Sequence, residues 1–215
     1  MTDSPGSSEP GDVSRETPPP HAAGVFSSRL PLAQQYAEIL ATDAVVRGLI
    51  GPREVPRIWT RHIMNSAVVV PRVPQGATVA DVGTGAGLPG LVWAIARPDL
   101  QVTLIEPLLR RTTFLVDAVS SLGLTNVEVL RSRAEDVTST YDVVTARAVA
   151  ALDKLGRWCM PLVSPGGVML AMKGRSAAEE VEVATATLHR LGATSIVVTT
   201  YDNDDVPTTV VEVTK

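Results

Sequence analysis

The sequence of 215 residues lacks several features that commonly decide a protein's class. Its single cysteine, Cys159, rules out an internal disulfide and a cysteine-rich metal site. No apolar run approaches the ~20 residues that span a bilayer, and no basic stretch followed by an apolar one opens the chain. These absences exclude a disulfide-stapled secreted scaffold, and they predict a cytoplasmic protein that does not enter the membrane.

Basic charge is also scarce, since 19 Lys and Arg stand against 23 Asp and Glu, for a formal net charge of -4. Its distribution is uneven. Residues 1–24 hold one basic and four acidic side chains, residues 176–215 hold two and seven, and residues 25–175 hold 16 and 12. Phosphate binding needs clustered Lys and Arg, so this small central excess argues against a general RNA binder. It suits an enzyme that recognises a structured substrate locally.

Three segments differ in composition. Residues 1–24 contain five Pro, three Gly and four Ser, and are predicted to form a disordered tail because they can bury little apolar surface. Residues 25–75 show helical spacing of apolar residues and form a predicted N-terminal helical extension. One helix runs from Ser27 or Ser28 to Gly51, with a possible break at Thr42, and a second covers residues 54–70. Residues 76–215 form the main domain.

The main domain alternates short apolar runs with helical patterns, which predicts a doubly wound α/β fold with a mostly parallel, seven-stranded sheet. The last two strands are joined by a polar link too short for a crossover helix, so they should pair antiparallel. The predicted strands cover residues 78–82, 102–105, 127–130, 142–145, 168–172, 195–200 and 208–213. The predicted helices cover residues 88–96, 110–122, 150–162 and 177–191.

A glycine-rich loop, DVGTGAGLPG at residues 81–90, joins the first predicted strand to the first helix of this domain. Glycine lets the backbone approach a ligand closely and a helix N-terminus offers free N–H groups, so a nucleotide-like ligand is expected there. Gly85, Gly87 and Gly90 match the G-x-G-x-x-G of dinucleotide-binding proteins, and Glu106 ends the second strand 21 residues after Gly85. An NAD-dependent oxidoreductase is therefore one alternative.

An acidic residue inside the strand end favours another ligand. Asp81 precedes the alternating glycines Gly83, Gly85 and Gly87, whereas an NAD-binding strand is normally apolar up to its first glycine. The pattern D-x-G-x-G-x-G followed by a strand-end acid resembles the S-adenosyl-L-methionine loop of class I methyltransferases. In that Rossmann-like family the loop packs against the amino acid part of the cofactor, and the acid, here Glu106, accepts hydrogen bonds from both ribose hydroxyls.

Two further absences narrow the chemistry of such an enzyme. The Asn or Asp-Pro-Pro-aromatic motif of enzymes that methylate exocyclic amines does not follow the fourth predicted strand, which reads YDVVTARA at residues 141–148. Cys159, the one candidate nucleophile for pyrimidine carbon methylation, is better explained as a small buried side chain. What remains is attack by an atom that is already a good nucleophile.

Six segments of the chain, in this order and spacing, are TRHIMNS (60–66), DVGTGAGLPG (81–90), EPLLRRTTFL (106–115), RSRAED (131–136), TARAVAALDKL (145–155) and PLVSPGGVMLAMKG (161–174). Over about residues 27–200 they resemble the ribosomal small-subunit methyltransferase G family, also called glucose-inhibited division protein B. The resemblance implies an enzyme that transfers methyl from S-adenosyl-L-methionine to N7 of a guanine in the decoding-region loop of 16S rRNA, by direct displacement and without a covalent enzyme intermediate. A non-catalytic RNA-binding protein with this fold is a second alternative, and a monomer is expected.

The same resemblance places Gly83, Leu88, Ala134, Glu135 and Arg147 at positions that contact the cofactor, whereas Glu106 and Lys173 are assigned from their places at strand ends. Arg147 and Lys173 end two predicted strands beside the cleft and are expected to act in catalysis, Arg147 by holding the cofactor, guanine O6 or an rRNA phosphate, and Lys173 through phosphate or product-site electrostatics. Asn65 departs from the family, which commonly has Asp there. The cofactor-binding residues expected are Gly83, Gly85, Leu88, Glu106, Ala134, Glu135 and Arg147.

Overall fold

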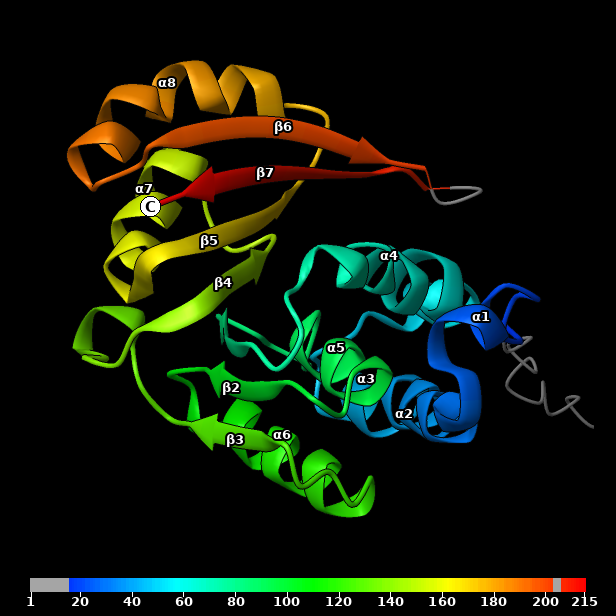
Figure 1. The fold of residues 1–215 in the computed structure, drawn as a ribbon. Coiled ribbons are helices and arrows are strands. Elements are labelled where there is room, and N and C mark those ends of the chain that lie inside the picture. The colour runs from blue at the N-terminus through cyan, green and yellow to red at the C-terminus, as the bar shows by residue number, and fades with distance from the viewer. Residues whose placement is uncertain (1–15, 203–205) are drawn as a thin grey trace, which may run out of the picture.

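The computed structural model describes residues 16–202 and 206–215 and has a seven-stranded sheet at its centre (Figure 1). The strand order is β3-β2-β1-β4-β5-β7-β6, and neighbouring strands are parallel except where β7 pairs with β5 and β6. All predicted strands are present and the antiparallel final pair is confirmed. The strands are β1 (Thr78–Val82), β2 (Gln101–Ile105), β3 (Val127–Leu130), β4 (Tyr141–Arg147), β5 (Val163–Lys173), β6 (Ser195–Tyr201) and β7 (Thr208–Thr214).

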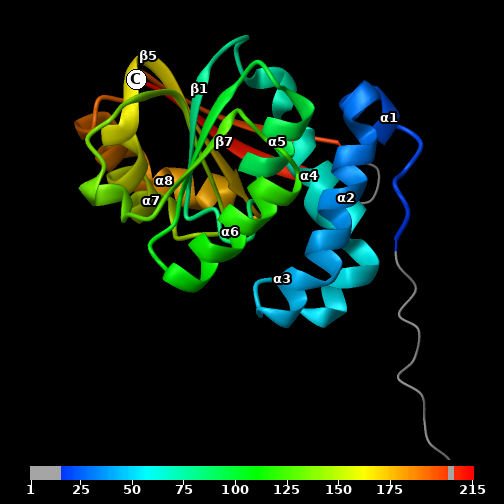
Figure 2. The same cartoon turned by 90° about the horizontal axis from the view of Figure 1, so that it is seen from below.

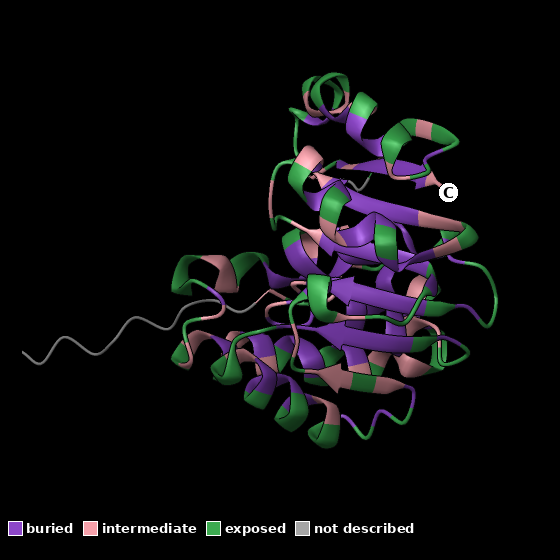
Figure 3. Cartoon of the chain, turned by 90° about the vertical axis from the view of Figure 1, so that its left-hand side faces the viewer, coloured by how far each residue is buried: buried purple, intermediate pink, exposed green. Residues whose placement is uncertain are grey.

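Helices cover both faces of the sheet, as the near-continuous apolar strands require (Figure 3). Successive strand residues point to opposite faces, so Val79 joins one core cluster and Ala80 the other. The first cluster is shared with α5 and α6 and the second with α7 and α8. These helices are α5 (Gly90–Ala96), α6 (Leu109–Ser121), α7 (Leu152–Cys159) and α8 (Ala177–Arg190).

The N-terminal extension packs on the α5 side of the sheet, away from α7 and α8 (Figure 2). Its first predicted helix is interrupted at Thr42, as expected, where α2 (Leu30–Ala41) gives way to α3 (Asp43–Val46). Buried Tyr36 and Leu40 of α2 share a core cluster with Trp93 of α5. One continuous core therefore joins the extension to the sheet.

The second predicted helix, over residues 54–70, is not a regular α-helix. A 3₁₀ segment (Pro52–Arg57) leads into a π-helical segment (Ile58–Met64), a short α4 (Asn65–Ala67) and a 3₁₀ turn (Val70–Arg72). Pro56 cannot donate a backbone hydrogen bond, so it disfavours an α-helix through this stretch. The buried face was correctly predicted, because Ile58, Trp59, His62 and Ile63 are all buried.

The predicted tail ends earlier than residue 24. Residues 1–15 lie outside the described chain, but α1 (Ala22–Phe26) begins inside the predicted tail and buries both its end residues. Phe26 packs edge-to-face on Trp59 with ring centroids 6.3 Å apart, and the Glu16 carboxylate accepts a 2.7 Å hydrogen bond from the Trp59 amide. These contacts order a segment whose composition alone predicts disorder. Among the described residues, no helix has the length and apolar character needed to cross a bilayer.

Candidate active site

The glycine-rich loop between β1 and α5 is built around the buried carboxylate of Asp81. Its Oδ2 accepts hydrogen bonds from Thr84 Oγ1 at 2.6 Å and from the amide of Gly90 at 2.8 Å. Burial raises the pKa of Asp81 to about 6, although these two hydrogen bonds act to lower it. Gly83 and Gly85 have φ of +67° and +61°, values that residues with a Cβ rarely adopt. The glycine-rich motif therefore forms a loop that is held in shape by its own Asp81 carboxylate.

Gly90 is required for packing. A Cβ on this residue would lie 2.4 Å from Leu104 Cδ2 and 2.8 Å from Asp81 Oδ2. We expect Gly90→Ala to lower the free energy of unfolding by ~1–3 kcal/mol because a methyl group there overpacks the core. Urea denaturation measures this change. Gly24→Ala, where a Cβ meets nothing within 4 Å, is the control and should be neutral or slightly stabilising. A loss for Gly90→Ala no larger than the control's would contradict this packing argument.

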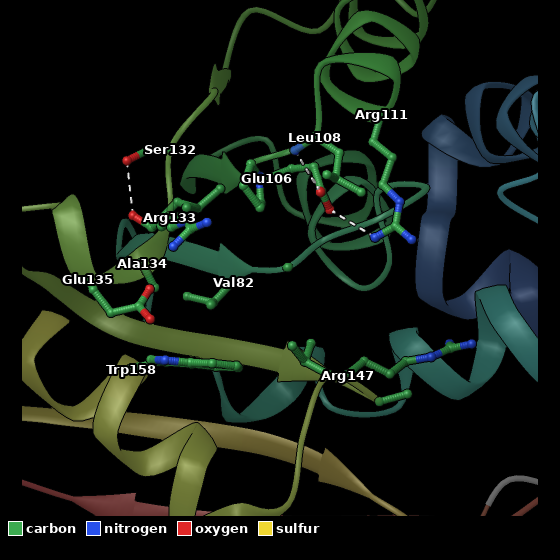
Figure 4. Close-up of a pocket in the computed structure, with 15 residues that line it drawn as sticks. Val82, Glu106, Leu108, Arg111, Ser132, Arg133, Ala134, Glu135, Arg147 and Trp158 are labelled. Atoms are coloured by element: carbon green, nitrogen blue, oxygen red, sulfur yellow. Dashed lines mark hydrogen bonds and ion pairs between the residues drawn. The ribbon is translucent and has the colours of Figure 1, made fainter.

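A cavity of about 540 Å³ opens beside this loop at the carboxyl ends of β1, β2 and β4 (Figure 4). We call it the loop cavity. Its size lies within the range of small-molecule and cofactor sites. Its position is where open α/β sheets bind ligands. Its lining residues are Val82, Gly83, Ile105, Glu106, Pro107, Leu108, Arg111, Ser132, Arg133, Ala134, Glu135, Arg147, Ala148, Val149 and Trp158.

Glu106 occupies one wall of the loop cavity and is 1% exposed. Its Oε1 accepts from the Leu108 amide at 3.1 Å, and its Oε2 lies 3.3 Å from the Gly85 amide and 3.4 Å from Arg111 NH1. The carboxylate is thus held beside the glycine loop, as predicted from its spacing. A fixed carboxylate in this position can accept hydrogen bonds from vicinal hydroxyls of a ligand.

The opposite wall is formed by a 3₁₀ turn (Ala134–Asp136) and by α7. Figure 4 shows Ala134 and Glu135 near the indole of Trp158, across the cavity from Glu106. Ala134 and Glu135 were expected beside the cofactor and line this cavity, whereas Trp158 was not among the residues predicted for the site. A large aromatic on the polar side of a helix was the available signal. Cys159 itself is fully buried, and burial raises the pKa of its thiol, so it is no nucleophile.

Leu88 does not line the loop cavity. Its side chain is 7% exposed and belongs to the core cluster around α5. Its amide lies 3.1 Å from the carbonyl oxygen of Thr84, within the glycine loop. Leu88 therefore packs the loop onto the core, and its contact with the cofactor stays a prediction.

A second cavity of about 660 Å³ adjoins the first, and the two share Arg147 and Ala148 as lining residues. Five of its lining side chains are cationic and one, Glu180, is anionic, so we call it the arginine cavity. Clustered guanidinium groups suit phosphate and nucleic acid recognition. The cationic residues are Arg57, Arg61, Arg147, Lys173 and Arg175.

Asn65 fixes the extension to the far side of the arginine cavity. Its Nδ2 donates to Thr208 Oγ1 at 2.6 Å, and Thr208 Oγ1 lies 3.2 Å from the Asn65 carbonyl oxygen. The departure from Asp that the sequence shows at this position therefore supplies an amide donor to β7. An ionised Asp could not donate this bond.

Arg147 ends β4 between the two cavities, and its guanidinium points toward the extension (Figure 4). NH1 lies 3.2 Å from the His62 carbonyl oxygen and 3.1 Å from Ser66 Oγ, and NH2 lies 2.6 Å from His62 Nδ1. These contacts engage three of the five guanidinium N–H groups. The sequence predicted that Arg147 lies at a strand end beside the cleft, but it did not predict the contacts with His62 and Ser66.

His62 is held as a neutral donor and acceptor. Burial, followed by the charge of Arg147, lowers its pKa to about 4, although Glu54 acts to raise it. Because Arg147 donates to Nδ1, the ring proton lies on Nε2, which is 3.1 Å from Glu54 Oε2. Glu54 therefore positions the His62 ring, and the His62 ring in turn orients the Arg147 guanidinium.

The low pKa of His62 makes its contribution to stability depend on pH. Between its unfolded value near 6.5 and its native value near 4, the unfolded chain binds a proton that the native chain does not. This contribution is complete above pH ~6.5 and decreases as the pH falls through that window. An NMR titration of the ring should show a midpoint near 4, and Arg147→Met should shift it upward. A midpoint above 6 in the wild type would contradict the arrangement.

Lys173 is not a free cation. Its side chain is 8% exposed, its Nζ donates to the Ala150 carbonyl at 2.7 Å, and it forms an ion pair with Glu180 Oε2 at 2.7 Å. The expected role in phosphate or product-site electrostatics does not fit this geometry, because the charge is already paired. Lys173 instead holds the chain that follows β4.

Comparison with known proteins identifies the family. The family model described as rRNA small subunit methyltransferase G matches residues 29–206. The Ribosomal RNA small subunit methyltransferase G of Salinispora tropica is 59% identical over 196 residues, which cover 85% of this chain and 81% of that protein. The protein of the same name from Thermobifida fusca is 56% identical over 183 residues, covering 84% and 74%.

Solved structures agree on the fold. M. jannaschii TYW2 in complex with AdoMet has a TM-score of 0.58 at 17% identity, over 73% of this chain and 76% of that one. The SAM-dependent O-methyltransferase of Thermotoga maritima has a TM-score of 0.54 at 16% identity, over 70% and 64%. The antiparallel β7 speaks against the NAD-dependent oxidoreductase, and the sequence relatives, which are named as methyltransferases, speak against both alternatives. The chain has the class I S-adenosyl-L-methionine-dependent methyltransferase fold and belongs to the rRNA small subunit methyltransferase G family.

Proposed function

We propose that this chain methylates N7 of a guanine in the decoding-region loop of 16S rRNA, with S-adenosyl-L-methionine as the methyl donor. The observation that carries the proposal is the junction of two cavities of different character at Arg147 and Ala148. One has the features of a nucleoside site and the other is lined by cations. A methyl donor in the first would face a nucleic acid base in the second.

The loop cavity fits the cofactor. A carboxylate that is 1% exposed at Glu106 can accept from both ribose hydroxyls. Gly83 lines the cavity, and a Cβ on Gly85 would come within 4 Å of the Gly83 carbonyl oxygen alone, at 3.9 Å, so the backbone there can lie close to the methionine part. The backbone of Ala134 and Glu135 lies where it can meet the adenine edge, with the Trp158 ring available for stacking. A contact between Leu88, at the end of the glycine loop, and the cofactor belongs to the same proposal.

Guanine N7 has an in-plane lone pair and no proton, so its attack needs no general base. As the N7–carbon bond forms, the carbon–sulfur bond breaks, and sulfur keeps the electron pair while the guanine ring becomes cationic. The chain's part is alignment and exclusion of water. Guanidinium N–H groups of Arg147 that are not engaged by His62 and Ser66 can donate to guanine O6, which leaves N7 free.

The major-groove edge of an RNA helix is deep and narrow, so the target guanine must lie in a loop or be splayed out. The exposed arginines of the arginine cavity would then hold phosphates beside it. The substrate is 16S rRNA, free or in an assembling small subunit, and the enzyme acts as a monomer in the cytoplasm. Its small central charge excess suits local recognition followed by release.

Arg175 tests the phosphate role. It is exposed at the rim of the arginine cavity, so Arg175→Gln should raise KM for rRNA roughly 3- to 10-fold and reduce the salt dependence by about one phosphate contact. The affinity for S-adenosyl-L-methionine should not change. Arg190→Gln removes the same charge at the far end of α8 and is the matched control. Equal KM values for the two variants would remove Arg175 from the RNA site.

The class of reaction is tested with the purified chain. Calorimetry should show binding of S-adenosyl-L-methionine and none of NAD. Labelled methyl should then pass from the cofactor to 16S rRNA or small subunits, and not to 23S rRNA under the same conditions. Tighter binding of NAD, or equal labelling of both rRNAs, would contradict the proposal.

A further inference from the structure

The loop that connects β4 to α7, residues 148–151, lies between the two cavities. Ala148 lines both of them, and Val149 lines the loop cavity. A Cβ built on Gly83 would lie 3.0 Å from Val149 Cγ2, so Val149 packs directly against the glycine-rich loop. Residues 148–151, which we call the partition loop, therefore border the junction of the two cavities, through which a transferred group must pass.

The backbone of the partition loop is held in an unfavourable conformation. Ala148 has a φ of +55°, in the left-handed region where a Cβ clashes with the backbone. Such a residue persists only when its surroundings impose the conformation, and these residues cluster at functional sites. The conformation of Ala148 thus calls for contacts that hold the loop.

Two opposite charges hold the loop at its end. Lys173 Nζ donates to the Ala150 carbonyl at 2.7 Å, and Glu180 Oε2 accepts from the Leu152 amide at 2.8 Å. The two side chains pair with each other at 2.7 Å, and Ser176 Oγ lies 3.0 Å from Glu180 Oε1. The cation therefore meets a backbone acceptor and the anion a backbone donor, which fixes the polarity of the arrangement.

Glu180 also replaces a missing helix cap. Leu152 begins α7, and its N-cap residue, Ala151, has no side chain that can accept from the first amides. Burial acts to raise the pKa of Glu180, but hydrogen bonds from Lys173, Leu152 and Ser176 outweigh it, so the pKa lies below its usual value. The carboxylate is thus ionised where it meets both partners.

We propose that Lys173 and Glu180 are positioning residues that clamp the partition loop. They would thereby fix the junction of the two cavities, where the methyl donor and the target base meet. Glu180 has no role in the chemistry assigned above, and Lys173 acts here through the backbone and not on a phosphate. This inference rests on the proposed function, because it gives the two cavities their occupants. A mobile partition loop would allow the donor and the base to depart from the aligned geometry that direct displacement needs.

Four variants separate a clamp from a simple ion pair. Glu180→Ala and Lys173→Met each remove one side of it. Glu180→Gln keeps an oxygen that can accept from the Leu152 amide. The exchange Lys173→Glu with Glu180→Lys keeps the ion pair but presents the wrong charge to each backbone group. Glu179→Ala, an exposed neighbour in the first turn of α8, is the matched control.

We expect kcat for rRNA methylation to fall at least ~10-fold in Glu180→Ala and in the exchanged pair, with KM for rRNA changed less than ~3-fold. Glu180→Gln should retain more of the activity than Glu180→Ala. Wild-type kcat in Glu180→Ala, or in the exchanged pair, would overturn the proposal. Assays run well below the melting temperature of every variant keep loss of fold apart from loss of alignment.

A second measurement needs no RNA. Hydrogen exchange at the Leu152 amide should be at least ~10-fold faster in Glu180→Ala than in Glu179→Ala, and unchanged protection would overturn the clamp. This result is independent of the substrate. A wild-type protein that methylates no rRNA would contradict the proposed function, and the exchange data would still decide whether the clamp exists.

Discussion

Glu106→Ala is expected to raise the Kd for S-adenosyl-L-methionine by ~100-fold. The carboxylate is almost fully buried on the wall of the loop cavity and is oriented by the amides of Gly85 and Leu108. Its removal would take away two charge-assisted hydrogen bonds to the ribose, each contributing ~1.5–3 kcal/mol, offset in part by water entering the site. Isothermal titration calorimetry measures the change directly.

The control for this loss is Glu128→Ala. Glu128 lies exposed on β3 and does not line the loop cavity, so Glu128→Ala removes the same charge away from the site. Its Kd should equal the wild-type value. Because Glu106 also meets Arg111, thermal unfolding of both variants must show that the fold is kept. A Kd for Glu106→Ala within threefold of the control would show that the ribose is bound elsewhere.

Arg147→Met is expected to lower kcat for rRNA methylation by ~100- to 1,000-fold, the usual cost of removing a preorganised donor from a reacting site. The unbranched methionine fills a similar volume but leaves His62 Nδ1 and Ser66 Oγ without the Arg147 donor, while the His62 carbonyl keeps its 2.7 Å hydrogen bond from Ser66 Oγ. We therefore also expect a loss of stability of ~1–3 kcal/mol.

Arg147→Lys distinguishes charge from geometry. Lysine keeps the charge but cannot reach the same three acceptors with a planar fork, so most of the kcat should still be lost. Arg157→Met, on the exposed side of α7, is the control and should leave kcat unchanged. Near wild-type activity in Arg147→Lys would reduce the role of Arg147 to that of a positive charge.

The strands were predictable because apolar runs bounded by polar or turn residues have few other structures available. Each of α5, α6 and α8 lies within two residues of its predicted limits. β5 was predicted too short, because proline and glycine, here Pro165 and the two glycines after it, are uncommon inside strands. The strand begins at Val163, and Gly167 lies so close to β4 that a Cβ would be 2.8 Å from the Asp142 carbonyl. The glycine there marks a close approach between strands.

The site was predictable where chemistry follows a strand end, as at Gly83 and Glu106. It was not predictable where distant segments meet. The π-helical turn at residues 58–64 brings His62 against Arg147, 85 positions away, and no local pattern encodes that contact. Likewise, the pairing of Lys173 with Glu180 and the partition loop depends on how α8 packs beside α7 and the β6–β7 pair. The sequence could suggest that Lys173 mattered but not by which contacts.

In the reaction that we propose, the base in the arginine cavity is a guanine that is methylated at N7. The most direct measurement treats unmodified 16S rRNA with the purified enzyme and S-adenosyl-L-methionine, then cleaves the RNA chemically at N7-methylguanosine and maps the breaks by primer extension. We expect one new break, at a guanine of the decoding-region loop, and we expect this break to be absent with Arg147→Met. A methyl group incorporated without any break, or breaks spread over many guanines, would contradict it.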